Sequence, residues 1–256
     1  MEKACVSGVS LPAVYAPETV EMMYRSLSVP AEIVCSIRQY FVAASHLYGN
    51  ISLKHLLHIY NQQNSPVSQE DFLSVADIIR HEANDFCVLD LEALYEDAPA
   101  TEPMERVVVS LLILSFGLNK YYELSEQQKG KPFTVLPREA FLAYLDPCYY
   151  PATAEHLHML AFLRSCRSRL HGLVKDTLRS IQTLIWLGCG LEETIHCLET
   201  GGFRFHSHAE RREFTVLFHA MERHTRTIAN RGQTAAAMGR GKNLFFAAHR
   251  RLFSGI

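Results

Sequence analysis

The chain lacks any apolar run long enough to cross a lipid bilayer. The longest such run, from Val107 to Leu118, covers 12 residues and contains Ser110 and Ser115. A membrane-spanning helix needs about 20 apolar residues, so this run predicts a buried helix of a globular protein. No apolar stretch follows the opening Met-Glu-Lys, so we expect neither a secretory signal nor a membrane partner.

Cysteine is present but is not arranged for cross-linking or for zinc. The seven cysteines are irregularly spaced and include no Cys-x-x-Cys pair. This usage is typical of reduced proteins, so we expect a cytoplasmic location. Histidine pairs occur at His156-x-His158 and His206-x-His208. No cysteine pair or nearby carboxylate completes a set of zinc ligands, so we predict no metal site. We expect Ser207, between His206 and His208, to cap a helix.

Motifs for nucleotide binding and for nucleophilic catalysis are absent as well. The sequence has no Gly-x-Gly-x-x-Gly, no P-loop and no Gly-x-Ser-x-Gly. We therefore predict a protein that is not an enzyme, has no catalytic residues and uses no cofactor. An enzyme whose site is assembled only by the fold is the alternative.

Basic residues are scarce in the first part of the chain, and acidic residues are scarce in the last part. Residues 1–150 carry 19 Asp and Glu against 10 Lys and Arg, a net charge of −9. Residues 203–256 carry 3 against 10, a net charge of +7. The total of −2 therefore hides two oppositely charged ends, and a basic segment attracts polyanions or acidic surfaces.

Apolar residues recur at helical spacing through most of the chain, which predicts a mainly α fold. In the first part we expect a helix after Pro30, a short extended piece at Asn50, and a helix over 53–63 that is capped by Ser52. A further helix opened by Ser68 and a strand over 86–91 follow. This order predicts a winged-helix-like N-terminal unit, and a plain helical bundle is the alternative.

The second part predicts a helical bundle. We expect one long helix over 104–128 and further helices over 154–170, 173–187, 191–200 and 209–230. The proline-containing stretch 97–103 is the predicted boundary. It separates a winged-helix-like module, residues 1–97, from a helical C-terminal domain with a basic end, residues 104–256.

The helix that would read DNA in a winged-helix unit carries the wrong charge for that task. Its acidic residues are Glu70, Asp71, Asp77, Glu82 and Asp85, against one arginine, Arg80, so its net charge is near −4. Phosphate contacts by Lys and Arg supply most of non-specific DNA affinity. We therefore expect this unit to dock or dimerise rather than read a groove.

The last predicted helix carries the candidate binding site. At about 100° per residue, one face is apolar and the opposite face carries basic and amide side chains. These candidate anion- or partner-binding residues are Arg212, His219, Arg223, Arg226 and Asn230, with Arg231 following. Arginine binds phosphate or carboxylate in bidentate fashion. The alternative is a solvated face whose charges are met by the acidic half of the chain.

The C-terminal stretch from Met238 to Phe246 is basic and contains aromatic residues. This mixture suits single-stranded nucleic acid, whose bases stack on aromatic rings. It also suits a terminal helix over 244–253 that packs on the body of the protein.

Two short stretches, 47–64 and 222–234, carry a resemblance to other proteins. The segment Arg226 to Thr234, with Asn-Arg-Gly-Gln-Thr at its end, resembles uncharacterised bacterial helical proteins that often carry a C-terminal SEC-C-type zinc motif. In this chain Ala235 replaces the proline usual there, and Gly-Arg-Gly-Lys stands in place of the cysteine-rich tail. A zinc-dependent role is therefore not implied. The resemblance does imply that Arg226, Asn230, Arg231 and Gly232 act as a unit, either structural or as an anion pocket.

Together these patterns predict a non-enzymatic interaction or regulatory protein that docks another macromolecule. We expect a protein partner or self-association. The alternative is a nucleic-acid-binding protein that uses the basic segment 203–256.

Overall fold

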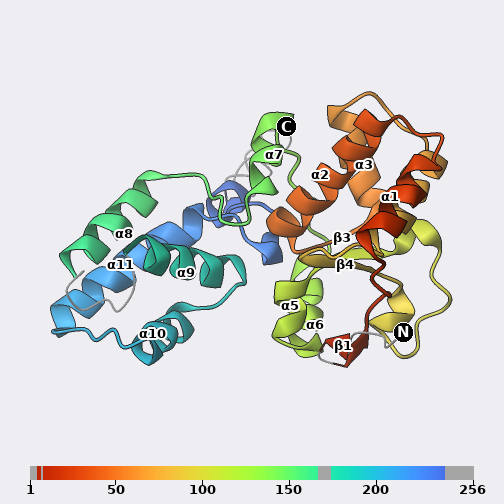
Figure 1. Ribbon diagram of the computed structural model, residues 1–256. Coiled ribbons are helices and arrows are strands. Elements are labelled where there is room, and N and C mark those ends of the chain that lie inside the picture. The colour runs from red at the N-terminus through yellow and green to blue at the C-terminus, as the bar shows by residue number, and fades with distance from the viewer. Residues whose placement is uncertain (1–4, 7, 167–173, 240–256) are drawn as a thin grey trace, which may run out of the picture. The chain divides into compact units, whose positions relative to one another are not determined.

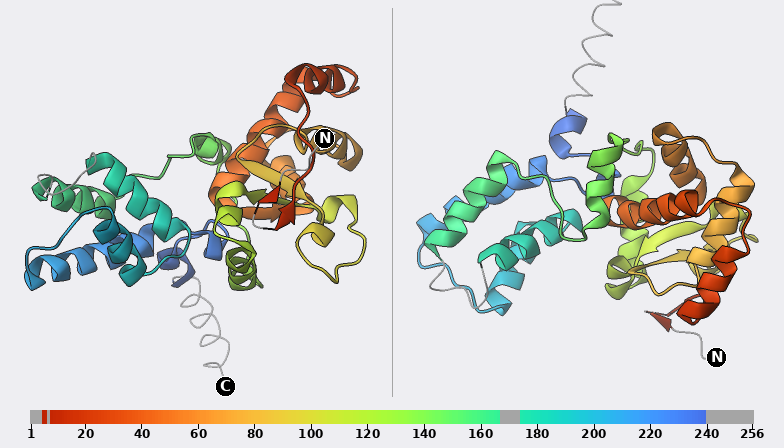
Figure 2. Two further views of the ribbon diagram at one scale, coloured as in Figure 1. Left: turned by 60° about the horizontal axis from the view of Figure 1, so that its bottom comes forward. Right: turned by 45° about the horizontal axis from the view of Figure 1, so that its top comes forward.

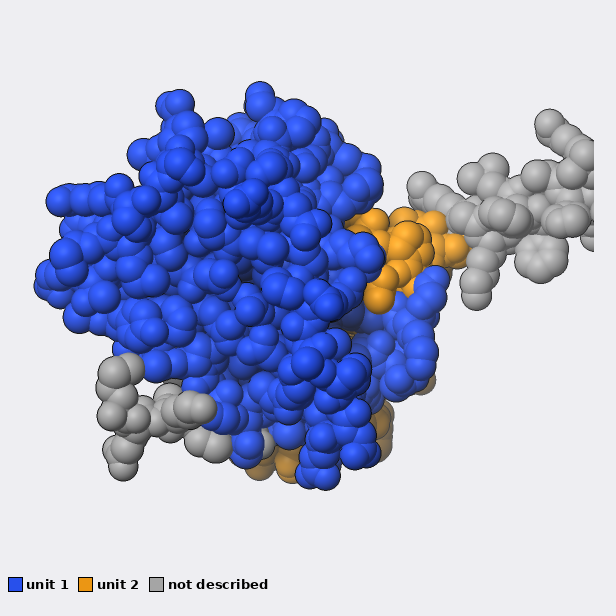
Figure 3. Space-filling view, turned by 90° about the vertical axis from the view of Figure 1, so that its right-hand side faces the viewer, with its two compact units in different colours: residues 1–130, 135–149 blue, residues 131–134, 150–256 orange. Residues whose placement is uncertain are grey.

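The computed structural model describes residues 5, 6, 8–166 and 174–239 (Figure 1). The chain forms two compact units, both mainly helical as predicted. Unit 1 contains residues 1–130 and 135–149, and unit 2 contains residues 131–134 and 150–256 (Figure 3). The predicted boundary stretch 97–103 lies inside unit 1. The units therefore divide the chain differently from modules of residues 1–97 and 104–256.

Unit 1 combines helices with two small antiparallel sheets. Its helices are α1 (Pro17–Arg25), α2 (Ala31–Tyr48), α3 (Leu53–Gln63), α4 (Gln69–Ile79), α5 (Leu111–Ser115), α6 (Leu118–Gln128) and α7 (Arg138–Leu142), with short 3₁₀ helices η1 (Leu91–Ala93), η2 (Pro103–Glu105) and η3 (Ala143–Leu145). Its strands are β1 (Cys5–Val6), β2 (Val9–Ser10), β3 (Asn50–Ser52), β4 (Phe86–Leu89) and β5 (Val107–Ser110). The larger sheet has the order β3-β5-β4 and is antiparallel throughout.

The central strand β5 corrects the predicted helix over 104–128. It contains three consecutive valines, and β-branched side chains favour strands over helices. Val108 pairs with Ile51 of β3 and with Val88 of β4, and its side chain is fully buried. Gly117, at φ 95°, then separates α5 from α6. A short apolar run does not by itself distinguish a buried strand from a buried helix, and the β-branched residues decide here.

The predicted helix boundaries around this sheet are confirmed. Ser52 caps α3 by accepting the backbone N–H of His55 at 3.5 Å, and Ser68 caps α4 by accepting that of Asp71 at 3.0 Å. Gly49 ends α2 at φ 72°. The hydroxyl oxygens thus satisfy backbone donors that the first turn of a helix leaves unpaired.

Aromatic packing on α2 forms much of the core of unit 1. Tyr40 lies 4.8 Å from Phe141 of α7 and 4.9 Å from Tyr60 of α3, measured between ring centroids, and Phe41 lies 5.6 Å from Phe72 of α4. Figure 1 shows α2 on one side of the β3-β5-β4 sheet and the α5–α6 pair on the other. Helix α2 is therefore the element around which α3, α4 and α7 pack.

The N-terminal segment covers the outer side of α4. Helix α1 packs against α4, the ring of Tyr15 stacks on that of His81 at 4.2 Å, and His81 Nδ1 lies 2.7 Å from the carbonyl oxygen of Ala13. The exposed residues of α4 are Gln69, Glu70 and Asp77. The helix that we predicted to be an acidic docking face therefore leaves little of its surface open.

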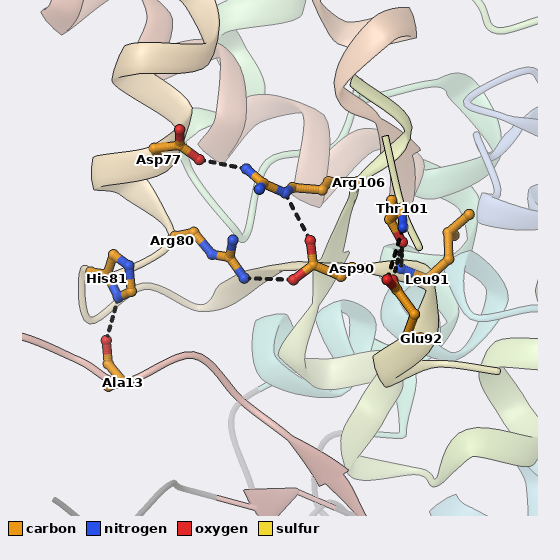
Figure 4. A network of polar contacts seen from close by, with 9 residues as sticks. All are labelled: Ala13, Asp77, Arg80, His81, Asp90, Leu91, Glu92, Thr101 and Arg106. Carbon is orange, nitrogen blue, oxygen red and sulfur yellow. Dashed lines mark hydrogen bonds and ion pairs between the residues drawn. The ribbon is translucent and has the colours of Figure 1, made fainter. Parts of the chain in front are cut away.

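An ion-pair network joins α4 to the connection between β4 and β5 (Figure 4). Asp90 accepts hydrogen bonds from Arg80 at 2.8 Å and from Arg106 at 2.8 Å, and Arg106 also pairs with Asp77. Burial acts to raise the pKa of Asp90, but Arg80 and Arg106 outweigh it and hold that pKa below its ordinary value. Asp77 and Asp90 are thus paired with arginines within unit 1.

A second ion pair fixes α2 to the turn that follows α4. His46 Nδ1 lies 2.7 Å from the carbonyl oxygen of Tyr144, and its Nε2 lies 2.5 Å from Asp85 Oδ2. Burial acts to lower the pKa of His46, but the carboxylate of Asp85 and the carbonyl of Tyr144 outweigh it and raise that pKa. The charged imidazolium donates from both nitrogens, so both contacts are satisfied by one protonation state.

The described residues of unit 2 contain four helices, and glycines lie in the turns between α9 and α10 and between α10 and α11. They are α8 (Ala154–Ser165), α9 (Val174–Trp186), α10 (Leu191–Thr200) and α11 (His208–His224), followed by the 3₁₀ helix η5 (Ile228–Asn230). Helices α8 and α11 lie side by side (Figure 2), and the ring of Phe162 lies 5.9 Å from that of Phe214. Residues buried in this core include Met159, Leu163, Cys166, Leu178, Ile181, Ile185, Ile195, Phe203, Phe218 and Met221.

We expect the stability of unit 1 to depend on pH through His46. Because the folded-state pKa of His46 is raised, its contribution is complete below about pH 6.5, the unfolded value, and is lost as the pH rises through the folded pKa. The destabilisation caused by His46→Gln should therefore be greatest near about pH 6 and should shrink at higher pH. Urea unfolding at a series of pH values measures this. The exposed His58→Gln variant is the control, and a His46→Gln effect that does not change with pH would contradict the assignment.

Candidate partner-binding face of unit 2

The structure divides the predicted arginine stripe between two local structures. Helix α11 ends at His224, six residues before the predicted end at Asn230, because Thr225 is extended with φ −82° and ψ 138°. The residues that remain on α11 are Arg212, His219 and Arg223. The residues that follow it in a turn are Arg226, Asn230 and Arg231. The stripe is therefore not one helix face.

A buried polar cluster accompanies the end of α11. Thr225 Oγ1 lies 2.9 Å from the carbonyl oxygen of Met221 and 3.3 Å from Gln182 Oε1. His156 Nε2 lies 2.5 Å from the same Gln182 oxygen, and His156 Nδ1 lies 2.8 Å from Thr153 Oγ1. Burial lowers the pKa of His156, so the neutral imidazole donates from Nε2 and accepts at Nδ1. This cluster fixes the point at which the chain leaves the helix.

The turn after α11 is closed by its own arginine. Arg226 pairs with Thr234 in an antiparallel bridge, and its Nη1 donates to the carbonyl oxygen of Gly232 at 2.8 Å. Arg231 is left-handed at φ 49°, and Gly232 follows at φ 74°. A left-handed residue followed by glycine allows this tight reversal.

The same turn binds residues 131–134, which belong to unit 2 although they lie about 100 residues earlier. Lys131 Nζ donates to the carbonyl oxygen of Ala229 at 2.7 Å and to Asn230 Oδ1 at 2.8 Å. Arg231 Nη1 donates to the carbonyl oxygen of Lys131 at 2.7 Å, and the Arg231 guanidinium lies 4.4 Å from the ring centroid of Phe133. Burial lowers the pKa of Arg231. Arg226, Asn230 and Arg231 are thus directed at backbone and at Lys131, which favours the structural interpretation over an anion pocket.

The outer face of α11 is different, because two of its arginines, Arg212 and Arg223, have no such acceptors among the described residues. Arg212, Val216, His219 and Arg223 recur at i, i+4, i+7 and i+11 and are all exposed, Val216 to 69%. We call these four residues the α11 face. In the part of the chain that the structure describes, Arg212 and Arg223 have neither a carboxylate nor a carbonyl partner. His219 lies 3.1 Å from Glu222.

The helix holds the α11 face in a fixed geometry. Phe214, Phe218 and Met221, on the opposite side of α11, are fully buried. At 1.5 Å per residue, Arg212 and Arg223 lie about 16 Å apart along the helix axis. Sequence periodicity found both arginines and His219. It missed Val216, which shares their spacing but has no polar chemistry, and Lys131, whose contacts depend on the tertiary fold.

The remaining candidate chemistry gives no second site among the described residues of unit 2. Ser207 caps α11 by accepting the Glu210 backbone N–H at 3.1 Å, as predicted for the His206-Ser207-His208 stretch. Among the described side chains, no three His, Cys, Asp or Glu residues are grouped to hold a metal ion. No helix over residues 8–166 and 174–239 is long and apolar enough to cross a membrane. The basic C-terminal stretch from residue 240 and the predicted helix over 244–253 lie outside the described residues.

Alanine substitutions should separate the two groups of arginines. Arg226→Ala or Arg231→Ala removes a charged hydrogen bond to a backbone carbonyl and should destabilise unit 2 by about 1–3 kcal/mol. Arg212→Ala and Arg223→Ala, which are matched in chemistry but exposed and unpaired, should change stability by less than about 0.5 kcal/mol. Differential scanning calorimetry measures both. Equal effects in the two groups would show that the turn does not depend on its arginines.

Comparison with known proteins does not assign this chain to a family. No protein-family model matches the chain, and no match was found among the curated proteins or the solved structures. The resemblance carried by residues 222–234 therefore stays a prediction. The function has to be inferred from the α11 face and from the geometry of each unit.

Proposed function

We propose that the protein is a non-enzymatic interaction protein whose unit 2 binds an acidic protein partner through the α11 face. The observation that carries this proposal is the pair of exposed arginines, Arg212 and Arg223, that have no acceptor among the described residues. The other arginines discussed above bind carboxylates or carbonyls. Free guanidinium groups on a rigid helix are suited to binding carboxylates in bidentate fashion.

The apolar residue between the arginines favours a protein partner. Val216 is 69% exposed and lies on the same face as Arg212 and Arg223. Protein interfaces combine an apolar centre with surrounding polar groups, and arginine is enriched in them. A partner with an apolar side chain flanked by carboxylates complements this arrangement.

Charge geometry argues against pairing of two α11 faces. In an antiparallel pair of identical helices Arg212 would lie near Arg223 of the second copy, and in a parallel pair each arginine would face itself. Like charges at such distances repel. The α11 face therefore supports a different partner better than a second copy of this chain.

Nucleic acid is the alternative partner and rests on the sequence of residues 203–256. Tight binding to a polyphosphate uses about 6–10 phosphate contacts, whereas the α11 face offers two unpaired arginines and one histidine. The described part of the basic segment therefore gives less support to nucleic acid than to an acidic protein surface.

We also infer that unit 1 is winged-helix-like. The support is the order α2, β3, α3, α4, β4, β5 with the sheet order β3-β5-β4. Helix α4 would be the recognition helix of such a unit, but α1 packs on it and Asp77 and Arg80 are engaged in the network around Asp90. These contacts argue against groove reading by α4.

Replacing both free arginines should weaken partner binding. We expect Arg212→Ala/Arg223→Ala to weaken binding to a synthetic amphipathic helix of Leu and Glu by at least about tenfold. Fluorescence anisotropy across a salt series measures this. Arg164→Ala/Arg179→Ala, which removes the same charge from exposed positions of α8 and α9, should bind like the wild type.

Two outcomes would contradict the proposal. Equal losses in the two double variants would show only non-specific attraction. Tighter binding to random oligonucleotides than to the peptide, with a steep dependence on salt, would support the nucleic-acid alternative instead.

A further inference from the structure

A short N-terminal segment of unit 1 lies over one side of α4. It comprises residues 13–27, which include α1, and we call it the N-terminal cover. The backbone N–H of Tyr15 donates to the carbonyl oxygen of His81 at 2.9 Å, and His81 Nδ1 lies 2.7 Å from the carbonyl oxygen of Ala13 (Figure 4). The rings of Tyr15 and His81 stack with their centroids 4.2 Å apart. These contacts fix the cover in a defined position.

The phase of α4 indicates which of its side chains the cover buries. The stripe of α4 that packs on α2 and the core contains Phe72, Val75, Ala76 and Ile79, which are all buried. At about 100° per residue, Ile78 lies about 110° from the middle of this stripe, yet it is only 4% exposed. The backbone N–H of His81 donates to the carbonyl oxygen of Ile78 at 2.9 Å, so the two residues are neighbours. Because the cover contacts His81, we attribute the burial of Ile78 to it.

The cover has the pattern of a helix that binds to another protein. Its inward-facing residues recur at i, i+3, i+4 and i+7, and they are Val20, Met23, Tyr24 and Leu27. On the outward side of α1 Glu18, Glu21 and Arg25 are exposed, and Met22 is 63% exposed. Anchors at this spacing are typical of amphipathic helices that lie on the apolar surface of a partner. Helix α1 therefore occupies α4 as such a ligand would, but from within the same chain.

The cover is held less firmly than the helices of the core. Val20 is the one buried residue among the nine of α1, whereas nine of the 18 residues of α2 are buried. The ion pair of Arg25 with Glu21 joins two residues of α1 itself. Among the described residues, no ion pair joins α1 to α4. Segments with few buried contacts open locally at a lower free energy than the whole domain unfolds.

We propose that the N-terminal cover is displaceable and that the side of α4 around Ile78 and His81 then binds an amphipathic helix of a partner protein. The cover is an autoinhibitory contact, because the two helices compete for one surface. The matching helix carries apolar residues at the spacing of those of the cover and an aromatic ring that stacks on His81. This surface lies within unit 1, so the proposal does not rest on the α11 face. The Arg212→Ala/Arg223→Ala variant should therefore open and bind as the wild type does.

Hydrogen exchange on the unmodified protein tests whether the cover opens. Native-state exchange across a denaturant series compares the amides of residues 17–25 with those of residues 31–48. We expect the amides of α1 to exchange through a local opening that is at least about tenfold more populated than the opening that exposes α2. This opening should depend little on denaturant, because it exposes little surface. Equal protection of the two helices throughout the series would show that α1 leaves only when unit 1 unfolds, and would overturn the proposal.

A peptide added in trans tests the surface beneath the cover. The probe is a synthetic peptide of residues 13–29, and fluorescence anisotropy measures its binding. Val20→Asp places a charge at the buried position of α1 and should release the cover. This variant should bind the peptide with a Kd below about 100 μM, at least about tenfold more tightly than the wild type does.

Two controls accompany the peptide. Met22→Asp adds the same charge on the outward side of α1, so this variant should bind the peptide as weakly as the wild type. A peptide that itself carries Val20→Asp should not bind the Val20→Asp variant, because its apolar anchor is lost.

Three results from these variants would overturn the proposal. The first is a folded Val20→Asp variant that does not bind the peptide. The second is equal binding by the Val20→Asp and Met22→Asp variants, which would show that the surface beneath the cover is not involved. The third is exchange of covers between two copies of the chain, because a second copy would then occupy the surface. Dimerisation of the wild type, together with a disulfide between the introduced cysteines of a Tyr15→Cys copy and a His81→Cys copy, would demonstrate this exchange.

Discussion

The pairing of β5 with both of its neighbours is the constraint on which unit 1 depends. Backbone hydrogen bonds at its two ends reach beyond the sheet: Ser110 N–H donates to Gly49 at 2.8 Å, Leu111 N–H donates to Asp85 at 2.9 Å, and Leu53 N–H donates to Arg106 at 2.9 Å. These bonds fix the end of α2, the start of α3 and the turn after α4 against one strand. The distance between α2 and that turn follows from this register.

The arginines of this chain have three different roles, and the groups that surround each arginine determine its role. In unit 1 Arg80 and Arg106 neutralise carboxylates that would otherwise repel one another. In the turn of unit 2 Arg226 and Arg231 donate hydrogen bonds to the backbone carbonyls of Gly232 and Lys131. On α11 Arg212 and Arg223 have no carboxylate or carbonyl acceptor among the described residues. Net charge along the sequence therefore shows only how many charged groups a segment offers for binding. The local backbone determines how many of these groups are already bound within the chain.

Local sequence rules predicted the helix starts well because caps depend on neighbouring residues. Ser52, Ser68 and Ser207 bind backbone donors within three residues, so their roles are readable from the sequence. The predicted helix over 104–128 is wrong at β5, because the strands that pair with its valines, β3 and β4, lie elsewhere in the sequence. The site was predicted in part: Arg212 and Arg223 hold their expected phase, whereas Arg226 does not, because a buried contact between Thr225 and Gln182 ends the helix. No local signal brings Lys131 to Ala229 and Asn230.

The contact between Lys131 and the turn at 226–233 has a consequence for biosynthesis. Residues 131–134 leave the ribosome between two parts of unit 1, and their partners Ala229 and Asn230 follow 98 and 99 residues later. Domains fold as units during synthesis, the N-terminal one first. Unit 1 can therefore fold before residues 229–230, the partners of Lys131, have been synthesised. A nascent chain arrested before residue 226 would contain most of a folded unit 1. Its residues 131–134 would gain their contacts with residues 226–233 only after the arrest ends.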